Sequence, residues 1–263
     1  MTSTDERPSD NEAATAELLW RGRDLPTRGP KRTLDLDVIA ETAVRIADAE
    51  GLAAVSMQRV AGALDVTKMA LYRYVTSKAE LTAIMIELAV GVPPDLAAVP
   101  GGWRARITEF TRLLAEAWQQ HPWLPWATVG ERAMGPKEVG WTECAVAAFD
   151  GTPLDGTEKL DAAFIVFGHI RNTQSRTTAG TQPWRADHDG RRLDAFLHEL
   201  VPDYADRFPA LTAATAEAAA ADGDGDGPGD NGRAFGLRCI LDGLDVLIAT
   251  RQPEAHRRGA RNA

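Results

Sequence analysis

Apolar residues near the start of the chain recur at the spacing of a helix. Leu36, Ile39, Ala43 and Ile46 lie three or four positions apart, and Gly51 follows as a glycine that can end a helix. This spacing predicts a helix with one buried face. Because no segment of the sequence shows sustained alternation of apolar and polar residues, the chain is predicted to be all-α.

Residues 56–81 carry the pattern of a helix-turn-helix. One apolar stripe runs through Val60 and Leu64, a second through Leu71 and Val75, and a short polar interruption separates them. The second helix is predicted over residues 67–74, with Thr67 as its N-cap. A capping box formed by Ser77 and Glu80 is predicted to open a longer helix over residues 77–90.

Burial of Leu71 and Val75 turns the polar side chains of the second helix outward. Hydroxyl, amide and cationic groups are the ones that contact phosphates and base edges of DNA. The sequence therefore predicts a DNA-binding surface formed by Ser56, Gln58, Arg59, Thr67, Lys68, Met69, Tyr72, Arg73, Tyr74 and Lys78.

The order of these elements, with LYRYVTSKAEL at the end of the motif, closely resembles the DNA-binding domain of the TetR family of bacterial regulators over residues 34–90. Asp65 stands where that family commonly has glycine in the turn, so Asp65 is expected to adopt a positive φ, which aspartate tolerates. Gln58 stands where the family often has arginine, which weakens the case for base readout by the first helix of the motif. The resemblance implies a homodimeric transcriptional regulator with a helical effector domain.

The net charge of the chain is -9, which opposes binding to a polyanion, but its distribution is uneven. The segment 20–32 carries Arg28, Lys31 and Arg32 among its cations, directly before the first predicted helix. Such a segment can follow the phosphate backbone or enter the minor groove. The alternative is a solvated leader without a DNA role. Residues before Trp20 are polar and acidic, so residues 1–33 are predicted to form a flexible, locally basic arm.

Proline and glycine breaks between residues 91 and 102 separate the DNA-binding domain, residues 34–92, from a second domain, residues 93–263. A flexible acidic loop is predicted over residues 222–232. It begins like a calcium loop, but Arg233 replaces the required glutamate, so no metal site is expected. Helices are predicted over residues 103–120, 123–130, 136–149, 157–176, 191–200, 204–221 and 233–251.

Aromatic residues are spread over several helices of the second domain. An aromatic wall with a few polar groups suits a small hydrophobic or aromatic effector. Aromatic residues at helical spacing also form ordinary protein core, and that alternative stays open. For His169, a surface or hydrogen-bonded core role is favoured over ligand recognition. The candidate effector-binding residues are Phe110, Leu114, Trp118, Trp126, Trp141, Phe164, Phe167 and Arg171.

The pairing surface of a dimer is predicted on residues 157–176 and 233–251, because the resemblance places a four-helix bundle there. The second segment also carries more apolar residues than one neighbour needs. The predicted function is a DNA-binding repressor that a small effector releases from its operator. Two alternatives are a helical enzyme acting on an apolar molecule and a DNA-binding scaffold without effector. The sequence shows no nucleophile–base pair, metal cluster or cofactor motif, so neither catalysis nor a cofactor is expected.

The sequence has no apolar run long enough to span a membrane and no apolar region of a signal peptide. Its two cysteines, Cys144 and Cys239, are far apart in sequence and have no close histidine partners. Buried free thiols in a reducing cytoplasm are favoured over a disulfide or a metal site.

Overall fold

The computed structural model describes residues 9–22, 34–174, 200–221 and 231–259, and these are helical, without strands. The chain divides into two compact units, Met1–Thr152 and Pro153–Ala263. The all-α prediction is confirmed. Within the described residues, no helix combines the length and the apolar character needed to cross a bilayer.

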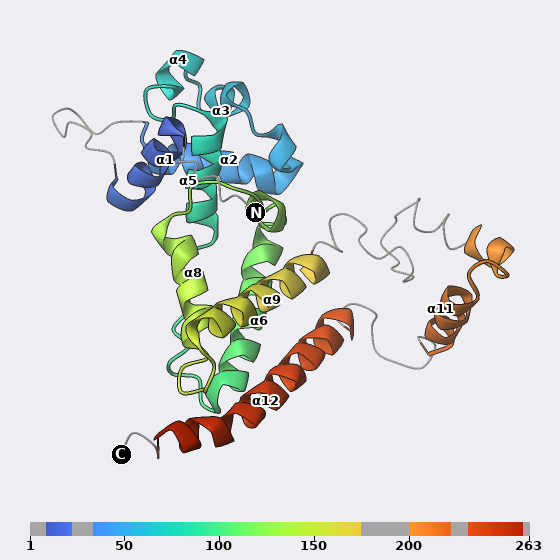
Figure 1. Cartoon of the computed structure of the whole chain (residues 1–263). Coiled ribbons are helices and arrows are strands. Elements are labelled where there is room, and N and C mark those ends of the chain that lie inside the picture. The colour runs from blue at the N-terminus through green and yellow to red at the C-terminus, as the bar shows by residue number, and fades with distance from the viewer. Residues whose placement is uncertain (1–8, 23–33, 175–199, 222–230, 260–263) are drawn as a thin grey trace. The chain divides into compact units, whose positions relative to one another are not determined.

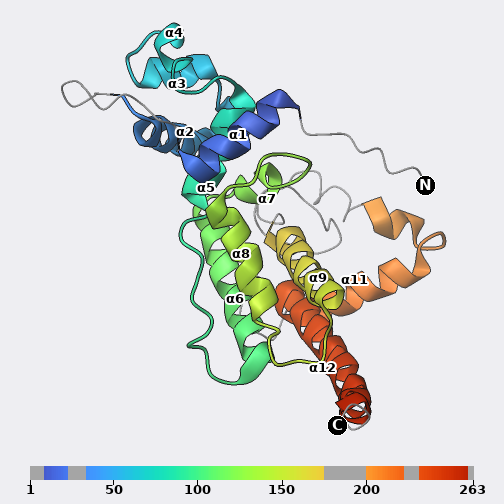
Figure 2. The same ribbon diagram turned by 60° about the vertical axis from the view of Figure 1, so that its left-hand side comes forward.

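The first helix, α1 (Asp10–Arg21), occupies part of the segment that was predicted to be a flexible arm, so that prediction is wrong for these residues. Ser9 and Glu12 form a complete capping box at its start. Thr15 and Leu18 are buried, and α1 packs against α5 (Lys78–Ala89). The helix has one narrow apolar face, and a short helix of this kind is stable because a neighbour, here α5, covers that face. Figures 1 and 2 show the two helices side by side.

The helix-turn-helix lies between α2 (Leu36–Glu50) and α5, and contains the 3-10 turn η1 (Leu52–Ala54), α3 (Met57–Ala63) and α4 (Lys68–Leu71) (Figure 1). The predicted stripes form its core, since Val60, Leu71 and Val75 are fully buried. The second helix is shorter than predicted. It ends at Leu71, and the amide of Tyr74 donates to the Leu71 carbonyl (2.9 Å), an i to i−3 bond that tightens the chain after the helix.

Three further helices complete the first unit: α6 (Gly102–Gln120), α7 (Leu124–Ala127) and α8 (Pro136–Ala147), with α6 and α8 packed against each other (Figure 2). Helix α7 is shorter than the predicted 123–130. Helix α8 begins at Pro136, whose ring fixes a helical φ and whose missing N–H costs nothing at this position.

The second unit contains α9 (Gly156–Gln174) and α12 (Asn231–Gly259), which pack as an antiparallel pair, together with η3 (Val201–Tyr204) and α11 (Pro209–Ala221). An ion pair joins Glu158 to Arg251 near one end. Near the other end, Nη1 of Arg233 donates to Oε1 of Gln174 (3.1 Å). Pairing of opposite ends of the two helices shows that they run in opposite directions.

Helix α12 begins two residues inside the loop predicted over 222–232, so the prediction is wrong for residues 231 and 232. Packing against α9 favours the longer helix, because Nε2 of His169 donates to the Arg233 carbonyl (2.9 Å). His169 therefore has the hydrogen-bonded role that the sequence favoured. The predicted helix 191–200 and the loop residues 222–230 lie outside the described residues, Leu200 excepted.

Both cysteines are free thiols, as the sequence predicts. Cys144 is partly buried on α8, and its Sγ donates to the Pro94 carbonyl (3.1 Å). Burial raises the pKa of this thiol above its usual value, which keeps it protonated. Cys239 is exposed on α12, so the expectation that both thiols are buried is wrong for this residue.

Candidate nucleic-acid interface

The turn between α3 and α4 has the backbone that the sequence predicts. Asp65 has a φ of 53°, and no other non-glycine residue in the described part of the chain has a positive φ. The amide of Val66 donates to the carbonyl of Ala61 (3.0 Å), which closes the turn. Aspartate tolerates this left-handed conformation better than most residues, so the absence of glycine leaves the turn intact.

Helix α4 is fixed by its cap and by its buried face. Oγ1 of Thr67 accepts a hydrogen bond from the amide of Ala70 (3.2 Å), as predicted for an N-cap. Leu71 and Val75 are fully buried and hold this helix and the following turn against the core. The opposite face is therefore open, and the side chain of Met69 is 75% exposed.

The open face of α4 combines cations with an aromatic ring. Nζ of Lys68 lies 5.6 Å from the centroid of the Tyr72 ring, within the range of a cation–π contact. That contact leaves the ammonium at the surface, where Met69 and Arg73 are exposed too. Of the predicted DNA-binding residues, those exposed are Ser56, Gln58, Arg59, Thr67, Lys68, Met69, Tyr72, Arg73 and Lys78.

The remaining predicted DNA-binding residues are Tyr74, Arg28, Lys31 and Arg32. Tyr74 is only partly exposed. Arg28, Lys31 and Arg32 lie outside the described residues, so their contact with DNA stays a prediction.

Two of the exposed residues also have structural contacts inside the domain. Oγ of Ser56 caps α3 by accepting from the amide of Arg59 (3.1 Å). Nη2 of Arg59 lies 2.6 Å from Oε1 of Glu50, at the end of α2. This guanidinium therefore already has a carboxylate partner. The sequence reasoning missed this pair because the two residues are brought together by the packing of α2 against α3.

The predicted capping box at the start of α5 is half right. Oγ of Ser77 accepts from the amide of Glu80 (3.0 Å), as expected. The carboxylate of Glu80, however, accepts from the amide (3.0 Å) and the hydroxyl of Thr76 rather than from the Ser77 amide. Glu80 is almost fully buried, and these bonds satisfy its charge while they fix the turn that enters α5.

Polar contacts at Asp48 join α2 of the DNA-binding domain to the segment that follows α6. Oδ1 of Asp48, on α2, accepts from Nε1 of Trp123 (2.7 Å) and lies 2.9 Å from Nδ1 of His121. These contacts connect α2 to the segment between α6 and α7. More than seventy residues separate the partners in sequence, so no local pattern could reveal them.

Several candidate effector-binding residues form the interior of the first unit. Phe110, Leu114, Trp118 and Trp141 are buried, and the rings of Phe110 and Trp141 meet edge to face with centroids 5.8 Å apart. Trp126 does not join them, because its side chain is 47% exposed on the short α7. Its prediction as a wall of an enclosed cavity is therefore not supported.

The candidates on α9 belong to the second unit and differ among themselves. Phe164 is 64% exposed, whereas Phe167 and Arg171 are partly buried. A cavity of about 230 Å³ lies elsewhere, between α1, α5 and residues 131–133. The described residues contain no cluster of three or more His, Cys, Asp or Glu side chains that could hold a metal ion.

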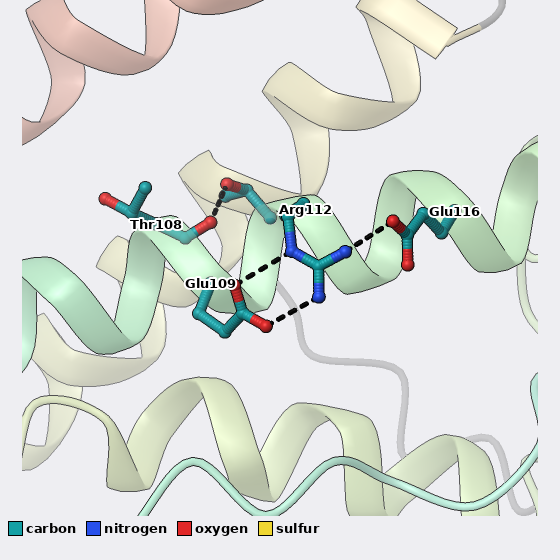
Figure 3. Close-up of polar contacts among 5 residues, drawn as sticks. Thr108, Glu109, Arg112 and Glu116 are labelled. Atoms are coloured by element: carbon teal, nitrogen blue, oxygen red, sulfur yellow. Dashed lines mark hydrogen bonds and ion pairs between the residues drawn. The ribbon is translucent and has the colours of Figure 1, made fainter. Parts of the chain in front are cut away.

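The outer face of α6 is a solvated surface and not a wall of a site. Arg112 donates from Nη2 to Oε1 of Glu109 (2.7 Å) and also pairs with Glu116 (Figure 3). The hydrogen bond from Arg112 holds the pKa of the Glu109 carboxyl below its usual value. The opposite face of α6 carries the buried side chains of Phe110, Leu114 and Trp118.

The sequence matches two family models. The model of bacterial regulatory proteins of the tetR family matches residues 39–83. The model of the tetracyclin repressor-like C-terminal domain matches residues 96–248. These spans agree with the helix-turn-helix and with the helices that follow it.

A named relative and solved structures of similar fold are also transcriptional regulators. The chain is 34% identical to the HTH-type transcriptional repressor DrrR1 of Streptomyces coeruleorubidus over 260 residues. The match covers 96% of this chain and 93% of the relative. It is similar to a structure described as a possible TetR family transcriptional regulator from Streptomyces coelicolor A3(2), at 27% identity and a TM-score of 0.64, over 81% of this chain and all of that one.

A further similar structure is ActR of Streptomyces coelicolor in complex with (S)-DNPA, with 21% identity and a TM-score of 0.64, over 84% of this chain and 100% of that one. At this identity the likeness concerns the fold. Another structure of ActR holds actinorhodin.

Proposed function

We propose, from the premise that this chain belongs to the TetR family of bacterial regulatory proteins, that it is a transcriptional repressor which a small effector releases from operator DNA. The named relatives are transcriptional regulators, a class of protein that is not enzymatic. The observation that carries the proposal is the open face of α4 and the turn after it, where Lys68, Met69, Tyr72 and Arg73 are all exposed while Leu71 is fully buried.

The short helix α4 suits entry into a major groove by its first residues. In this proposal the exposed Lys68 and Tyr72 would offer a donor and an amphipathic ring to base edges, and the exposed Lys78 at the start of α5 would contact a backbone phosphate. Base contacts discriminate between sequences, whereas phosphate contacts fix the register. One α4 covers only a few base pairs, so specificity requires a second copy about 34–36 Å away.

The second unit offers the surface for that pairing. Helices α9 and α12 leave large apolar side chains uncovered, although Leu241 and Ile248 on α12 are buried. Exposed apolar surface of this kind is typical of a protein interface. The homodimer we propose would bury the exposed residues Leu160, Phe164, Ile165, Phe235, Val246 and Leu247.

The effector we propose is a small hydrophobic or aromatic molecule. The support is the aromatic interior around Phe110, Trp118 and Trp141, which a flat apolar molecule could enter by displacing or separating these rings. Such a molecule releases DNA only if it binds the DNA-free arrangement more tightly than the DNA-bound one. The same proposal places the protein in the cytoplasm, with the DNA.

Selection of duplexes from a random-sequence pool by the purified full chain tests the DNA-binding part. We expect enrichment of a two-fold symmetric sequence, which the Lys68→Ala/Tyr72→Ala variant should bind at least about tenfold more weakly. Binding of every duplex alike, or equal binding by the variant, would contradict the assignment of Lys68 and Tyr72 to base recognition.

A panel of planar aromatic compounds, actinorhodin among them, tests the effector part. A compound that raises the melting temperature and dissociates the selected duplex supports the ligand-released repressor. If the duplex is bound but no compound on the panel alters its affinity, the alternative of an effector-independent DNA-binding protein is favoured.

A further inference from the structure

We propose that Glu87 is a positioning residue that couples the DNA-binding domain, residues 34–92, to the effector domain predicted over residues 93–263, because its carboxylate caps α8, a helix of the predicted effector domain that packs in the same compact unit as α5. Glu87 lies near the end of α5, the last helix of the DNA-binding domain. The cap that it provides belongs to α8. The coupling rests on the proposed function, whereas the cap itself can be tested without DNA or effector.

The N-terminus of α8 has no cap of its own. Gly135 occupies the N-cap position and has no side chain to accept a hydrogen bond, and Pro136 has no N–H. The first free amides are those of Lys137 and Glu138. The amide of Lys137 donates to Oε1 of Glu87 (2.6 Å), and the amide of Glu138 donates to Oε2 of Glu87 (3.3 Å). A negative charge at this end of a helix is also favoured by the helix dipole.

Gly135 is required by this arrangement for space and not for backbone conformation. Its φ of -92° and ψ of 172° are extended values that any residue adopts and that N-cap residues prefer. A Cβ at this position would lie 2.3 Å from Oε2 of Glu87. A serine, threonine or aspartate that capped α8 locally would therefore exclude the Glu87 carboxylate.

Helix α8 caps the end of α5 in return. Nε1 of Trp141 donates to the carbonyl of Val90 (2.9 Å), at the C-terminus of α5. This bond is buried, so its loss would leave an unsatisfied indole N–H and carbonyl away from water. Close packing surrounds it, because a Cβ on Gly140 would lie 2.5 Å from Cγ of Pro93.

The exchange of caps makes α5 and α8 move as one body. Helix α5 follows the exposed residues of α4 and begins at Ser77 and Lys78. Its 12 residues span roughly 18 Å. A displacement of the N-terminus of α8 must either carry α5 with it or break the bonds to Glu87. Because separation would also break the buried bond from Trp141 to the Val90 carbonyl, movement together is favoured.

A pair of variants separates coupling from simple stabilisation. Glu87→Ala removes the shared cap. Glu87→Ala/Gly135→Ser removes it too but supplies α8 with a local cap, in the space that the carboxylate vacates. Glu143→Ala is the matched control, because it removes an exposed carboxylate from the same helix.

Hydrogen exchange in the absence of DNA tests the cap. In Glu87→Ala we expect the amides of residues 137 and 138 to exchange about tenfold faster than in the wild type, and in the double variant to return toward the wild-type rate. Glu143→Ala should leave them unchanged. If the amides of residues 137 and 138 exchange equally fast in the wild type and in Glu87→Ala, Glu87 does not cap α8, whatever the function of the protein.

Hydrogen exchange with the selected duplex tests the coupling. In the wild type, DNA should slow exchange in the first turn of α8, which contacts no DNA, and in the double variant this effect should disappear although α8 is capped. A double variant that keeps the effect would show that Glu87 only stabilises α8. If no duplex is selected from the random pool, the proposed function fails, while the result without DNA still decides the cap.

Discussion

The open face of α4 and the open face of the α9–α12 pair both expose large side chains, yet they differ in what surrounds those side chains. Met69 on α4 is 75% exposed and Phe164 on α9 is 64% exposed. Lys68 and Arg73 flank Met69, whereas Leu160 and Ile165 lie near Phe164 along the helix. Exposure alone therefore does not identify a partner. The neighbouring side chains do, because the cations near Met69 favour a polyanion, whereas the apolar neighbours of Phe164 favour an apolar protein surface, although Arg238 lies over the Phe235 ring on the same pair of helices.

The two faces are also held in place by different means. Helix α4 spans only Lys68–Leu71 and depends on its cap, on the turn at Asp65 and on one buried leucine. Helices α9 and α12, of 19 and 29 residues, are held to each other by bonds at both ends. A change on α4 should therefore alter DNA recognition alone. A change on α9 or α12 should alter assembly and, through it, DNA binding.

The largest effect is expected from Phe164→Glu. A charge placed in the centre of the proposed dimer interface would have to be desolvated, so dimerisation should weaken by roughly 2 kcal/mol or more and operator binding should fall with it. Sedimentation velocity over a range of protein concentrations measures the first effect. Thr157→Glu, on the exposed first turn of α9, is the control. Dimers of unchanged strength would place the interface elsewhere.

The next largest effect is expected on α4. Lys68→Ala should change the sequence preference and cost about 1–3 kcal/mol on the best duplex, without altering dimerisation. Lys78→Ala should weaken all duplexes alike and reduce the slope of log K against log salt by about one unit. Fluorescence anisotropy at several salt concentrations distinguishes the two outcomes. If both variants behave identically, α4 does not read bases.

A smaller effect is expected from the basic segment that follows α1. Arg28→Gln/Lys31→Gln/Arg32→Gln should lower the salt slope by up to about three units while the sequence preference persists. Deletion of residues 1–22 provides the contrast. It removes the packing of Leu18 on α5, so it should lower the melting temperature. A triple variant with the wild-type slope would make the segment a leader without a DNA role.

The smallest effect is expected from Glu50→Ala. The ion pair with Arg59 is half-exposed on both sides, so its loss should change the free energy of unfolding by less than about 1 kcal/mol. DNA binding should become slightly tighter, with a steeper salt slope, because Arg59 becomes available to a phosphate. Weaker DNA binding in this variant would mean that Glu50 orients Arg59 for its contact.

The parts of the fold that were predicted correctly depend on neighbours in sequence. The buried positions of Val60, Leu71 and Val75 follow from helical spacing, and the caps at Thr67 and Ser77 involve amides three residues away. The positive φ of Asp65 follows from its place in the turn. Each is an interaction over a few residues, so the order of the amino acids is enough to predict it.

Two of the errors share the opposite property. Helix α1 is stable where α5 covers Leu18, some sixty residues further along the chain, and the polar acidic composition around Leu18 hides that contact. Trp126 has the composition of core but lies on the surface of α7. For both, tertiary packing rather than local composition decided the outcome. The error at Glu80 is local, because its carboxylate accepts from Thr76, four residues earlier.

The sequence by itself determined an all-α chain with a helix-turn-helix, its turn and the side chains exposed on α4, because these depend on periodicity and on caps within one or two helical turns. Only the tertiary structure decided which residues join the DNA-binding domain to the helices beyond it. The bonds of Asp48 to Trp123 and of Glu87 to the start of α8 cross 75 and about fifty residues of chain. No local pattern marks such partners, because a carboxylate on a helix surface is compatible with solvent, with a salt bridge or with the end of another helix until packing brings one of them within reach.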